Sequence, residues 1–236
     1  MKGKVALITG GSYGIGYGIA EVLLKAGLKV VITGRTESKI VESAKQLAGE
    51  TGGETLGLCG DVRSDKDMDA ISKKIIHEFG SLDVVVANAG VGHFGSIEDL
   101  SSDQWNQTID TNLTGVFNTV KSTVDEIKKS KGYIITIASL AGTNFFANGA
   151  AYNASKFGLV GFTQAIMLDL RKHGVKVSTI MPGSVTSHFA GHTPSDEDAW
   201  KIQPEDIGKL VKDMLEMNPR TLPSKIEVRP SQPPKS

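Results

Sequence analysis

The chain has 236 residues, of which 39% are hydrophobic, and 26 lysines and arginines balance 26 aspartates and glutamates. This length is enough for one domain with a large core, and the zero net charge gives no global basic field to attract nucleic acid or an anionic membrane. No stretch approaches the ~20 apolar residues of a membrane span, and the apolar run near the N-terminus is too short for a signal peptide, so we expect a cytoplasmic protein.

Short apolar runs alternate with amphipathic patterns along the whole chain. We expect strands near residues 4–9, 29–34, 54–59, 82–87, 132–138, 175–181 and 225–228, and helices near residues 15–27, 37–49, 65–79, 103–130, 150–173 and 204–217. Such alternation implies right-handed crossovers and a parallel sheet covered on both faces. We therefore predict an α/β fold: a doubly wound parallel sheet in a three-layer α/β/α sandwich, forming a single domain. A ligand would bind at the carboxyl ends of the strands.

The first expected strand runs directly into a glycine-rich turn. Gly10 permits a tight exit from the strand, while Gly14 and Gly16 leave room for a pyrophosphate to approach the backbone and for the next helix to pack on the sheet. The N-terminus of that helix supplies N–H donors and the positive end of a dipole. The spacing differs from the common Gly-x-Gly-x-x-Gly fingerprint, so a purely structural turn stays open.

The same turn also fits Gly-x-Ser-x-Gly, the nucleophile elbow of α/β-hydrolases, with Ser12 at its centre. That elbow normally follows several strands and an earlier oxyanion-hole loop, whereas here only one strand precedes it. The candidate histidines His173, His188 and His192 have no neighbours that single out a triad member. A serine hydrolase is therefore the least favoured alternative.

A second pattern lies in the expected helix at residues 150–173. Tyr152 and Lys156 stand four residues apart, and Ser139 precedes the tyrosine by thirteen. Residues i and i+4 share a helix face, so the Lys156 ammonium can lower the Tyr152 pKa from about 10 toward neutrality, which makes the tyrosine a usable proton donor. On its own the pair is a weak motif, because most such pairs are solvated or packed.

Taken together, these motifs resemble the short-chain dehydrogenase/reductase family over residues 4–228, and in particular its carbonyl reductases. The resemblance rests on Thr9, Gly10, Gly14, Gly16, Asn88, Ala89, Gly90, Asn112, Ser139, Tyr152, Lys156, Pro182 and Gly183, which occur in the family's order and spacing. It implies a Rossmann-type fold and hydride transfer between a nicotinamide cofactor and a carbonyl or secondary alcohol. The domain would span residues 1–228 with a short substrate lid at 188–203, followed by a flexible Pro-rich tail at 229–236.

Cofactor choice is indicated at the end of the second expected strand. An NAD enzyme usually has a carboxylate there for the ribose 2′-hydroxyl, but this chain has Gly34 followed by Arg35. A guanidinium can stack on adenine and bind a 2′-phosphate, so we predict NADP(H). Glu37 lies near enough to favour the contrary interpretation.

The resemblance assigns the other cofactor contacts by position. Asp61 and Val62 would bracket the adenine, the turn at 88–90 would line the adenosine ribose, and the segment from Pro182 would hold the nicotinamide carboxamide. The family's threonine aligns with Ser187, but Thr186 stands one position earlier, so which hydroxyl makes that contact stays open. The full expected set is Gly10, Ser12, Tyr13, Gly14, Ile15, Gly16, Arg35, Asp61, Val62, Asn88, Ala89, Gly90, Tyr152, Lys156, Pro182, Gly183, Val185 and Ser187.

The resemblance also implies the catalytic roles. Tyr152 would be the acid in reduction, Ser139 would stabilise the developing alkoxide, and Lys156 would hold the nicotinamide ribose and tune the tyrosine. Asn112 resembles the family's fourth catalytic residue, which helps to place a water in the proton path, although an asparagine there can equally serve packing alone. An alcohol or sugar dehydrogenase working in the oxidising direction, and a cofactor-binding regulator without turnover, remain alternatives.

The substrate is less well defined by the sequence. The lid is short, and nearby aromatic residues can supply apolar walls for a bulky or aromatic carbonyl compound: His93, Phe94, Phe145, Phe146 and Phe189. The C-terminal segment lacks the glycine-rich end of reductases that act on acyl-carrier-bound ketones, so a role in fatty-acid synthesis is doubtful. No metal site is expected.

We expect a homodimer or homotetramer by resemblance, through the helices near 103–130 and 150–173. The apolar residues Leu159, Val160, Phe162 and Ile166 are candidates for that contact, although they can equally face the sheet. The single cysteine, Cys59, excludes an internal disulfide, and its apolar neighbours predict a buried strand thiol.

Overall fold

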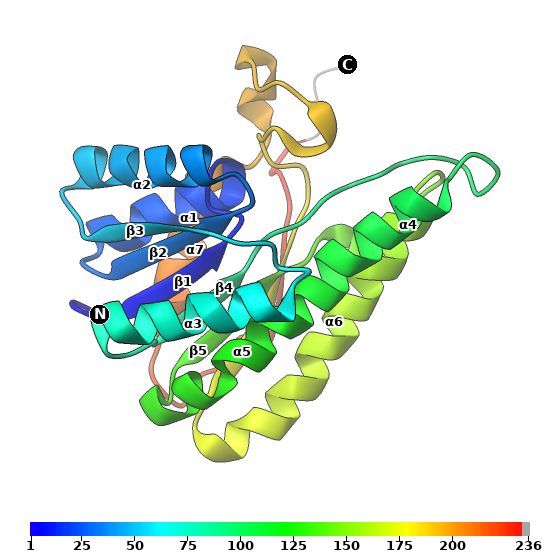
Figure 1. The fold of residues 1–236 in the computed structure, drawn as a ribbon. Helices are drawn as coiled ribbons and strands as arrows, with labels where there is room; N and C mark the ends of the chain where they lie inside the picture. Colours follow the sequence, from blue (N-terminus) through cyan, green and yellow to red (C-terminus); the bar gives the residue numbers. More distant parts are fainter. Residues whose placement is uncertain (233–236) are drawn as a thin grey trace.

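The computed structural model describes residues 1–232 and contains one parallel sheet over that range, in the order β3-β2-β1-β4-β5-β6-β7. Every strand expected from the sequence forms (Figure 1). The strands are β1 (Val5–Thr9), β2 (Lys29–Gly34), β3 (Thr55–Cys59), β4 (Val84–Ala87), β5 (Tyr133–Ile137), β6 (Lys176–Pro182) and β7 (Lys225–Val228). The α/β prediction is confirmed.

Helices cover both faces of this sheet, as the two hydrophobic clusters show (Figure 1). The first cluster packs α1 (Gly14–Lys25), α2 (Glu37–Thr51) and α7 (Pro204–Glu216) on one face. The second packs α3 (Asp65–Phe79), α5 (Gly115–Ser130) and α6 (Ala150–Leu170) on the other, while the short α4 (Ser102–Ile109) precedes α5. The central strands β1, β4 and β5 are buried throughout because both of their faces are covered.

The chain reverses its direction of travel across the sheet between β1 and β4. From β1 it moves outward through β2 to β3, and it then returns to place β4 on the other side of β1. Loops on the two sides of such a switch point diverge and leave a crevice at the carboxyl ends of the strands. Asn88 spans this crevice at its base, since its side chain donates to the carbonyls of Thr9 (2.9 Å) and Gly10 (3.1 Å).

The helix expected over residues 103–130 is interrupted. A π-helical segment at Asp110–Thr114 separates α4 from α5 and contains Asn112. The Asn112 amide accepts from the Val91 N–H (2.8 Å) and donates to the Val91 carbonyl (2.9 Å), which ties the wider turn to the loop after β4. The sequence pattern missed the interruption because the hydrophobic period continues through it.

The prediction that Cys59 is buried is wrong. Cys59 is exposed, with its thiol 3.5 Å from the Arg35 carbonyl. The reason is that β3 is an edge strand, which has a neighbouring strand on one side only. Within residues 1–232, no helix is long and apolar enough to cross a membrane.

The lid leaves the sheet after β6 and returns to it before α7. Its neck is closed by backbone hydrogen bonds from Thr186 to the Ile202 carbonyl (3.0 Å) and from Ile202 to the Ser184 carbonyl (3.1 Å). Two short 3-10 helices, Phe189–Gly191 and Asp196–Trp200, lie between these points. The expected tail at 229–236 falls partly outside the described residues, and its residues 229–232 lie beside the lid at the mouth of the cleft.

Helices α1 and α7 cross where Gly18 of α1 meets Gly208 of α7. This close crossing leads to a prediction about stability. A Cβ on Gly18 would lie 2.5 Å from the Pro204 carbonyl carbon, whereas a Cβ on Gly49 in α2 would meet nothing within 4 Å. We expect Gly18→Ala to lower the free energy of unfolding by about 1–3 kcal/mol through overpacking. The control Gly49→Ala should raise it by about 0.5–1 kcal/mol through helix propensity alone. Urea denaturation of both variants checks this, and an equal response would contradict the close crossing.

Candidate active site

A large cleft of about 1560 Å³ opens at the carboxyl ends of the strands. This exceeds the usual volume of a pocket for one small ligand, about 300–1000 Å³, and so leaves room for an extended ligand and a second molecule. The structure brings nearly all the predicted site residues to this cleft. Of them, only Gly16 and Asn112 do not line it.

The glycine turn forms one end of the cleft. Gly14 has φ +59°, and a Cβ on Gly16 would lie 2.3 Å from the Gly10 carbonyl oxygen, so side chains would disrupt this turn. Helix α1 begins at Gly14, and no side chain caps its N-terminus. Its first N–H groups are therefore available to an anion at the positive end of the helix dipole.

Basic side chains gather around the end of β2. Arg35 lines the cleft, and it takes part in none of the ion pairs found within residues 1–232. A Cβ on Gly34 would lie 2.9 Å from the Ser12 hydroxyl oxygen, so the glycine keeps this corner open. Lys39, in the first turns of α2, also lines the cleft, and our sequence reasoning missed it. Its position four residues after Arg35 was the available signal.

The cleft as a whole favours an anion. Among the described residues that line it are six lysines and arginines but one acidic residue, Asp61. Asp61 is itself paired with Arg63 (2.6 Å between Oδ2 and Nη2), and the Arg63 side chain holds the pKa of that carboxyl below its ordinary value. Arg63 is a second residue that the sequence analysis did not name.

The two predicted asparagines act first as backbone braces. Both Asn88 amide protons go to carbonyls of the glycine turn, and both Asn112 amide protons go to Val91 and to the Ser155 hydroxyl (3.0 Å). Any further donor contact from these side chains is excluded in this arrangement. A water near Asn112 would therefore bind its main-chain carbonyl or the spare lone pair of its amide oxygen.

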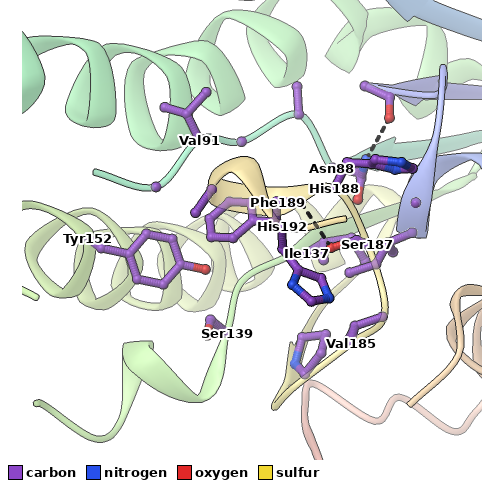
Figure 2. Close-up of a pocket in the computed structure, with 18 of the residues that line it drawn as sticks. Asn88, Val91, Ile137, Ser139, Tyr152, Val185, Ser187, His188, Phe189 and His192 are labelled. Atoms are coloured by element: carbon purple, nitrogen blue, oxygen red, sulfur yellow. Dashed lines mark hydrogen bonds between the residues drawn. The ribbon is translucent and has the colours of Figure 1, made fainter. Parts of the chain in front are cut away.

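Ser139, Tyr152 and Lys156 lie together at the inner wall of the cleft. Tyr152 stands in the first turn of α6 and points its hydroxyl toward the middle of the pocket, with Ser139 nearby at the end of β5 (Figure 2). One turn later Lys156 extends beneath the Tyr152 ring, its ammonium 5.7 Å from the ring centroid, and donates to the Ile137 carbonyl (3.0 Å). The three side chains thus meet as the sequence spacing predicts.

The protonation behaviour of this group differs from the sequence expectation. Burial raises the pKa of Tyr152, and hydrogen bonding with Ser139 opposes that rise only in part. Burial lowers the pKa of Lys156 to about 8. The expected lowering of the tyrosine pKa by the lysine is therefore wrong for the chain alone, because loss of hydration dominates both groups. A tyrosine that keeps its proton at neutral pH still suits the role of an acid.

The hydroxyls of Thr186 and Ser187 are used differently. The Thr186 hydroxyl donates to the Asp198 carbonyl (3.3 Å) and accepts from the Gln203 amide (3.1 Å). It therefore ties the start of the lid to the end of the lid. Ser187 lines the cleft, and its oxygen accepts from the Phe189 N–H (3.3 Å). Of the two, Ser187 is the one placed to contact a ligand.

A buried carboxylate fastens the far half of the lid. Asp198 is 4% exposed and binds both His192 (2.6 Å) and Lys201 (2.5 Å). Hydrogen bonds from His192 and then Lys201 lower the pKa of Asp198 to about 2. His192 therefore has a structural partner that the sequence did not reveal, and residues 1–232 hold no group of three metal-ligating side chains.

Four aromatic rings cluster at the Tyr152 end of the cleft. Phe146 and Phe189 line it as expected for apolar walls, whereas Phe94 packs against Phe146, Phe189 and Tyr152 but does not itself line the cleft. Phe145 is 86% exposed and does not line the cleft, so its predicted role in that wall is wrong. His93 lines the cleft as expected.

Comparison with known proteins agrees with this geometry. Residues 4–198 match the sequence model of the short chain dehydrogenase family, and the chain therefore belongs to that family of oxidoreductases. It is 33% identical to a 3-oxoacyl-[acyl-carrier-protein] reductase of Salmonella typhimurium, over 89% of this chain and 84% of the relative.

Two solved structures share the whole architecture. The alcohol dehydrogenase of the archaeon Thermococcus sibiricus, complexed with 5-hydroxy-NADP, superposes with a TM-score of 0.92 at 29% identity and covers 99% of both chains. A metagenomic short-chain oxidoreductase in complex with NADP superposes with a TM-score of 0.86 at 33% identity, over 98% of this chain and 99% of that one. The fold and the family assignment are thereby confirmed.

The burial of Lys156 generates a prediction about stability and pH. Its pKa is about 8 in the folded chain but near its ordinary value of about 10.4 in the unfolded chain, so below pH 8 the folded state bears the cost of a buried charge. Between these pKa values the unfolded state binds more protons, and stability therefore rises with pH. We expect Lys156→Met to raise the melting temperature at pH 7.5 by several degrees, and this advantage to shrink toward pH 10.

Thermal unfolding of the wild type and of Lys156→Met from pH 7.5 to pH 10 measures the difference between their melting temperatures. The other titrating groups are common to both proteins, so their contribution cancels in this difference. A difference that is constant with pH would show that Lys156 bears no such cost.

Proposed function

We propose that this chain is an NADP(H)-dependent reductase that converts a ketone or aldehyde to the alcohol. The observation that carries the proposal is the meeting of Ser139, Tyr152 and Lys156 at the inner wall of a cleft whose other end is a basic, glycine-lined anion site. The NADP and 5-hydroxy-NADP ligands named for the two structural neighbours support the choice of cofactor.

The residues of this chain fit a dinucleotide phosphate. The uncapped N-terminus of α1 and the side-chain-free surface at Gly14 suit the pyrophosphate, and the Arg35–Lys39 corner beside Ser12 suits a 2′-phosphate. The one acidic residue among the described residues that line the cleft, Asp61, is already paired with Arg63. In our proposal the adenine lies between Arg35 and Val62, and Ser187 contacts the nicotinamide amide.

The bound cofactor supplies the hydride that reaches the carbonyl carbon. Tyr152 donates its proton to the carbonyl oxygen, and the Ser139 hydroxyl stabilises negative charge on that oxygen while it develops. Burial makes the phenolate that this donation leaves behind costly, and in our proposal the Lys156 ammonium, 5.7 Å from the ring centroid, offsets part of that cost. A water held near Asn112 would return the proton. Carbonyl, hydride and proton together balance as the alcohol.

The oxidising direction uses the same residues in reverse, and an alcohol or sugar dehydrogenase therefore remains the second proposal. A regulator that binds cofactor without turnover is less consistent with the chain, since it needs no aligned Ser139, Tyr152 and Lys156. A serine hydrolase has no support: no histidine hydrogen-bonds Ser12 in residues 1–232, and His192 is paired with Asp198.

Assembly into a homodimer or homotetramer is also proposed, through the outer faces of α5 and α6. Phe117, Phe157 and Leu168 are exposed there by 49%, 43% and 55%, which favours a covering partner. Leu159, by contrast, is buried against the sheet and is unavailable for that contact. Sedimentation equilibrium would separate a monomer from these assemblies.

The catalytic role of Tyr152 can be tested directly. We expect Tyr152→Phe to lower kcat for NADPH-dependent reduction by about 10²–10⁴-fold, because the acid is lost while the ring remains. The affinity for NADPH, measured by fluorescence titration, should change by less than about threefold, since the anion site is untouched. Retention of turnover in this variant would contradict the mechanism.

Cofactor preference gives a second test. Arg35→Leu should raise the KM for NADPH by at least about tenfold and leave the KM for NADH little changed, because a charged hydrogen bond of about 1.5–3 kcal/mol acts on the 2′-phosphate alone. Lys39→Leu should act in the same direction more weakly. Lys45→Leu, further along α2 and outside the cleft, is the matched control. Parallel changes for both cofactors would count against the predicted 2′-phosphate site.

A further inference from the structure

The rings around Tyr152 come from three separate segments of the chain. Phe94 lies 5.4 Å from the Tyr152 ring, Phe189 lies 5.6 Å from it, and Phe146 lies 6.0 Å from Phe94, all measured between ring centroids. These separations fall in the range of about 4.5–7 Å that edge-to-face and tilted aromatic pairs prefer. The surroundings of the tyrosine are thus built to contact flat rings.

Two of these rings stand on fixed backbone. The loop that carries Phe94 is tied to the one that carries Phe146 through a hydrogen bond from the Gly95 N–H to the Asn148 carbonyl (2.9 Å). Asn153 on α6 then holds the second loop, donating to the carbonyls of Ala141 (2.8 Å) and Asn144 (2.9 Å). The backbone that carries Phe94 and Phe146 is therefore held in place, while the two rings are nearly half exposed.

The third ring stands on the lid. Phe189 is followed by Ala190 and Gly191, both in the left-handed region with φ +53° and +81°. A left-handed alanine costs about 1–2 kcal/mol, so the bend that follows Phe189 is strained. Figure 2 shows the Phe189 ring on the side of the pocket where the Tyr152 ring lies, and the two ring centroids are 5.6 Å apart.

The Phe189 ring fits there because Gly92 has no side chain. A Cβ on Gly92 would lie 2.5 Å from the Phe189 ring and 3.0 Å from the Phe94 ring. The protein's own phenyl group thus shows that a flat ring fits the slot between Gly92, Phe94 and Tyr152. A ring in that slot lies beside the phenol, since the centroids of the Phe189 and Tyr152 rings are 5.6 Å apart.

Two of the cations that line the cleft, one on the lid and one on the tail, already have acidic partners. Lys201 is paired with Asp198 (2.5 Å), and Arg229 with Glu227 (2.9 Å). Lys201 is thus held by a buried carboxylate, whereas the Arg229 pair is exposed to solvent and holds its cation weakly. A carboxylate or phosphate on the substrate would have to compete with these existing ion pairs.

Resting on the reductase function proposed above, we propose that the substrate is an uncharged aryl ketone or aldehyde, and that Phe189 determines this specificity by competition. Its ring occupies the place of the substrate's aryl group, and the substrate enters by displacing it. The flat slot beside Gly92 admits a planar ring and rejects a puckered one of equal carbon number.

Three ketones test the proposal with the whole chain and NADPH: acetophenone, cyclohexyl methyl ketone and butanone. The wild type should show kcat/KM for acetophenone at least about tenfold above that for cyclohexyl methyl ketone, because steric exclusion of a few atoms is worth about 1–3 kcal/mol. Equal values for the two rings would overturn the inference.

The variants are compared through the acetophenone-to-butanone ratio of kcat/KM. Gly92→Ala should lower this ratio about tenfold by filling the slot, and Phe189→Ala should raise it several-fold by removing the competing ring. Gly95→Ala is the matched control in the same loop, since its Cβ meets only the Leu100 nitrogen, at 4.0 Å, and its ratio should stay within about twofold of the wild type.

A lower ratio in Phe189→Ala would make Phe189 a wall instead of a competitor and would overturn the proposal. So would an unchanged ratio in Gly92→Ala. Turnover of butanone without preference for the flat ring would reject the aryl inference alone. Absence of turnover with every ketone, despite NADPH binding, would reject the reductase function and the inference with it.

Discussion

The reversal of strand order between β1 and β4 is the constraint on which the site depends. The loops that follow β1 and β4 diverge at this point. A cleft forms between them only where the two strands end at the same level of the sheet. Asn88 fixes that level, because its amide donates across the gap to the Thr9 and Gly10 carbonyls while its own N–H bonds the Thr9 hydroxyl. The glycine turn, and with it the start of α1, is therefore positioned from the neighbouring strand.

Burial of the reacting groups follows from this arrangement, and it has an energetic cost. Lys156 lies under Tyr152 with the Ile137 carbonyl as its one hydrogen-bond partner among the described residues, so its charge is poorly compensated. A chain selected for stability alone would place an apolar residue at this position. In our proposed function the lysine is retained because an uncompensated cation beside a phenol, next to an anion site, is what the chemistry requires.

The sequence predicted the elements that depend on local pattern. Strands with buried apolar runs, the glycine turn and the Tyr152–Lys156 spacing are all encoded within a few residues, and the fold, the family and the meeting of Ser139 with that pair followed from them. The features that it missed depend on neighbours far along the chain. The π-helical turn that contains Asn112 is tied by that side chain to Val91, which is 21 residues away.

Dependence on distant parts of the chain also explains why the environments of some side chains were predicted wrongly from the sequence. The exposure of Cys59 reflects the position of β3 at the sheet edge, and the Asp198 anchor requires the lid to fold back on itself. The direction of the Tyr152 pKa is likewise set by burial, which helix spacing cannot report. Nothing in the letters around Phe189 says that its ring turns inward, because the backbone bend at Ala190 has no characteristic sequence.

The closed neck of the lid separates two parts of the protein that evolution can alter independently. Backbone hydrogen bonds from Thr186 to the Ile202 carbonyl and from Ile202 to the Ser184 carbonyl hold the two ends of the lid together. Residues 187–201 between them form a strap, meaning a loop whose two ends are adjacent. A strap of different length or sequence could be exchanged at this neck without moving β5 or α6. New substrates could then be acquired by recombining straps on an unchanged scaffold, and laboratory libraries would best be confined to residues 188–201, which leaves Ser187 in place.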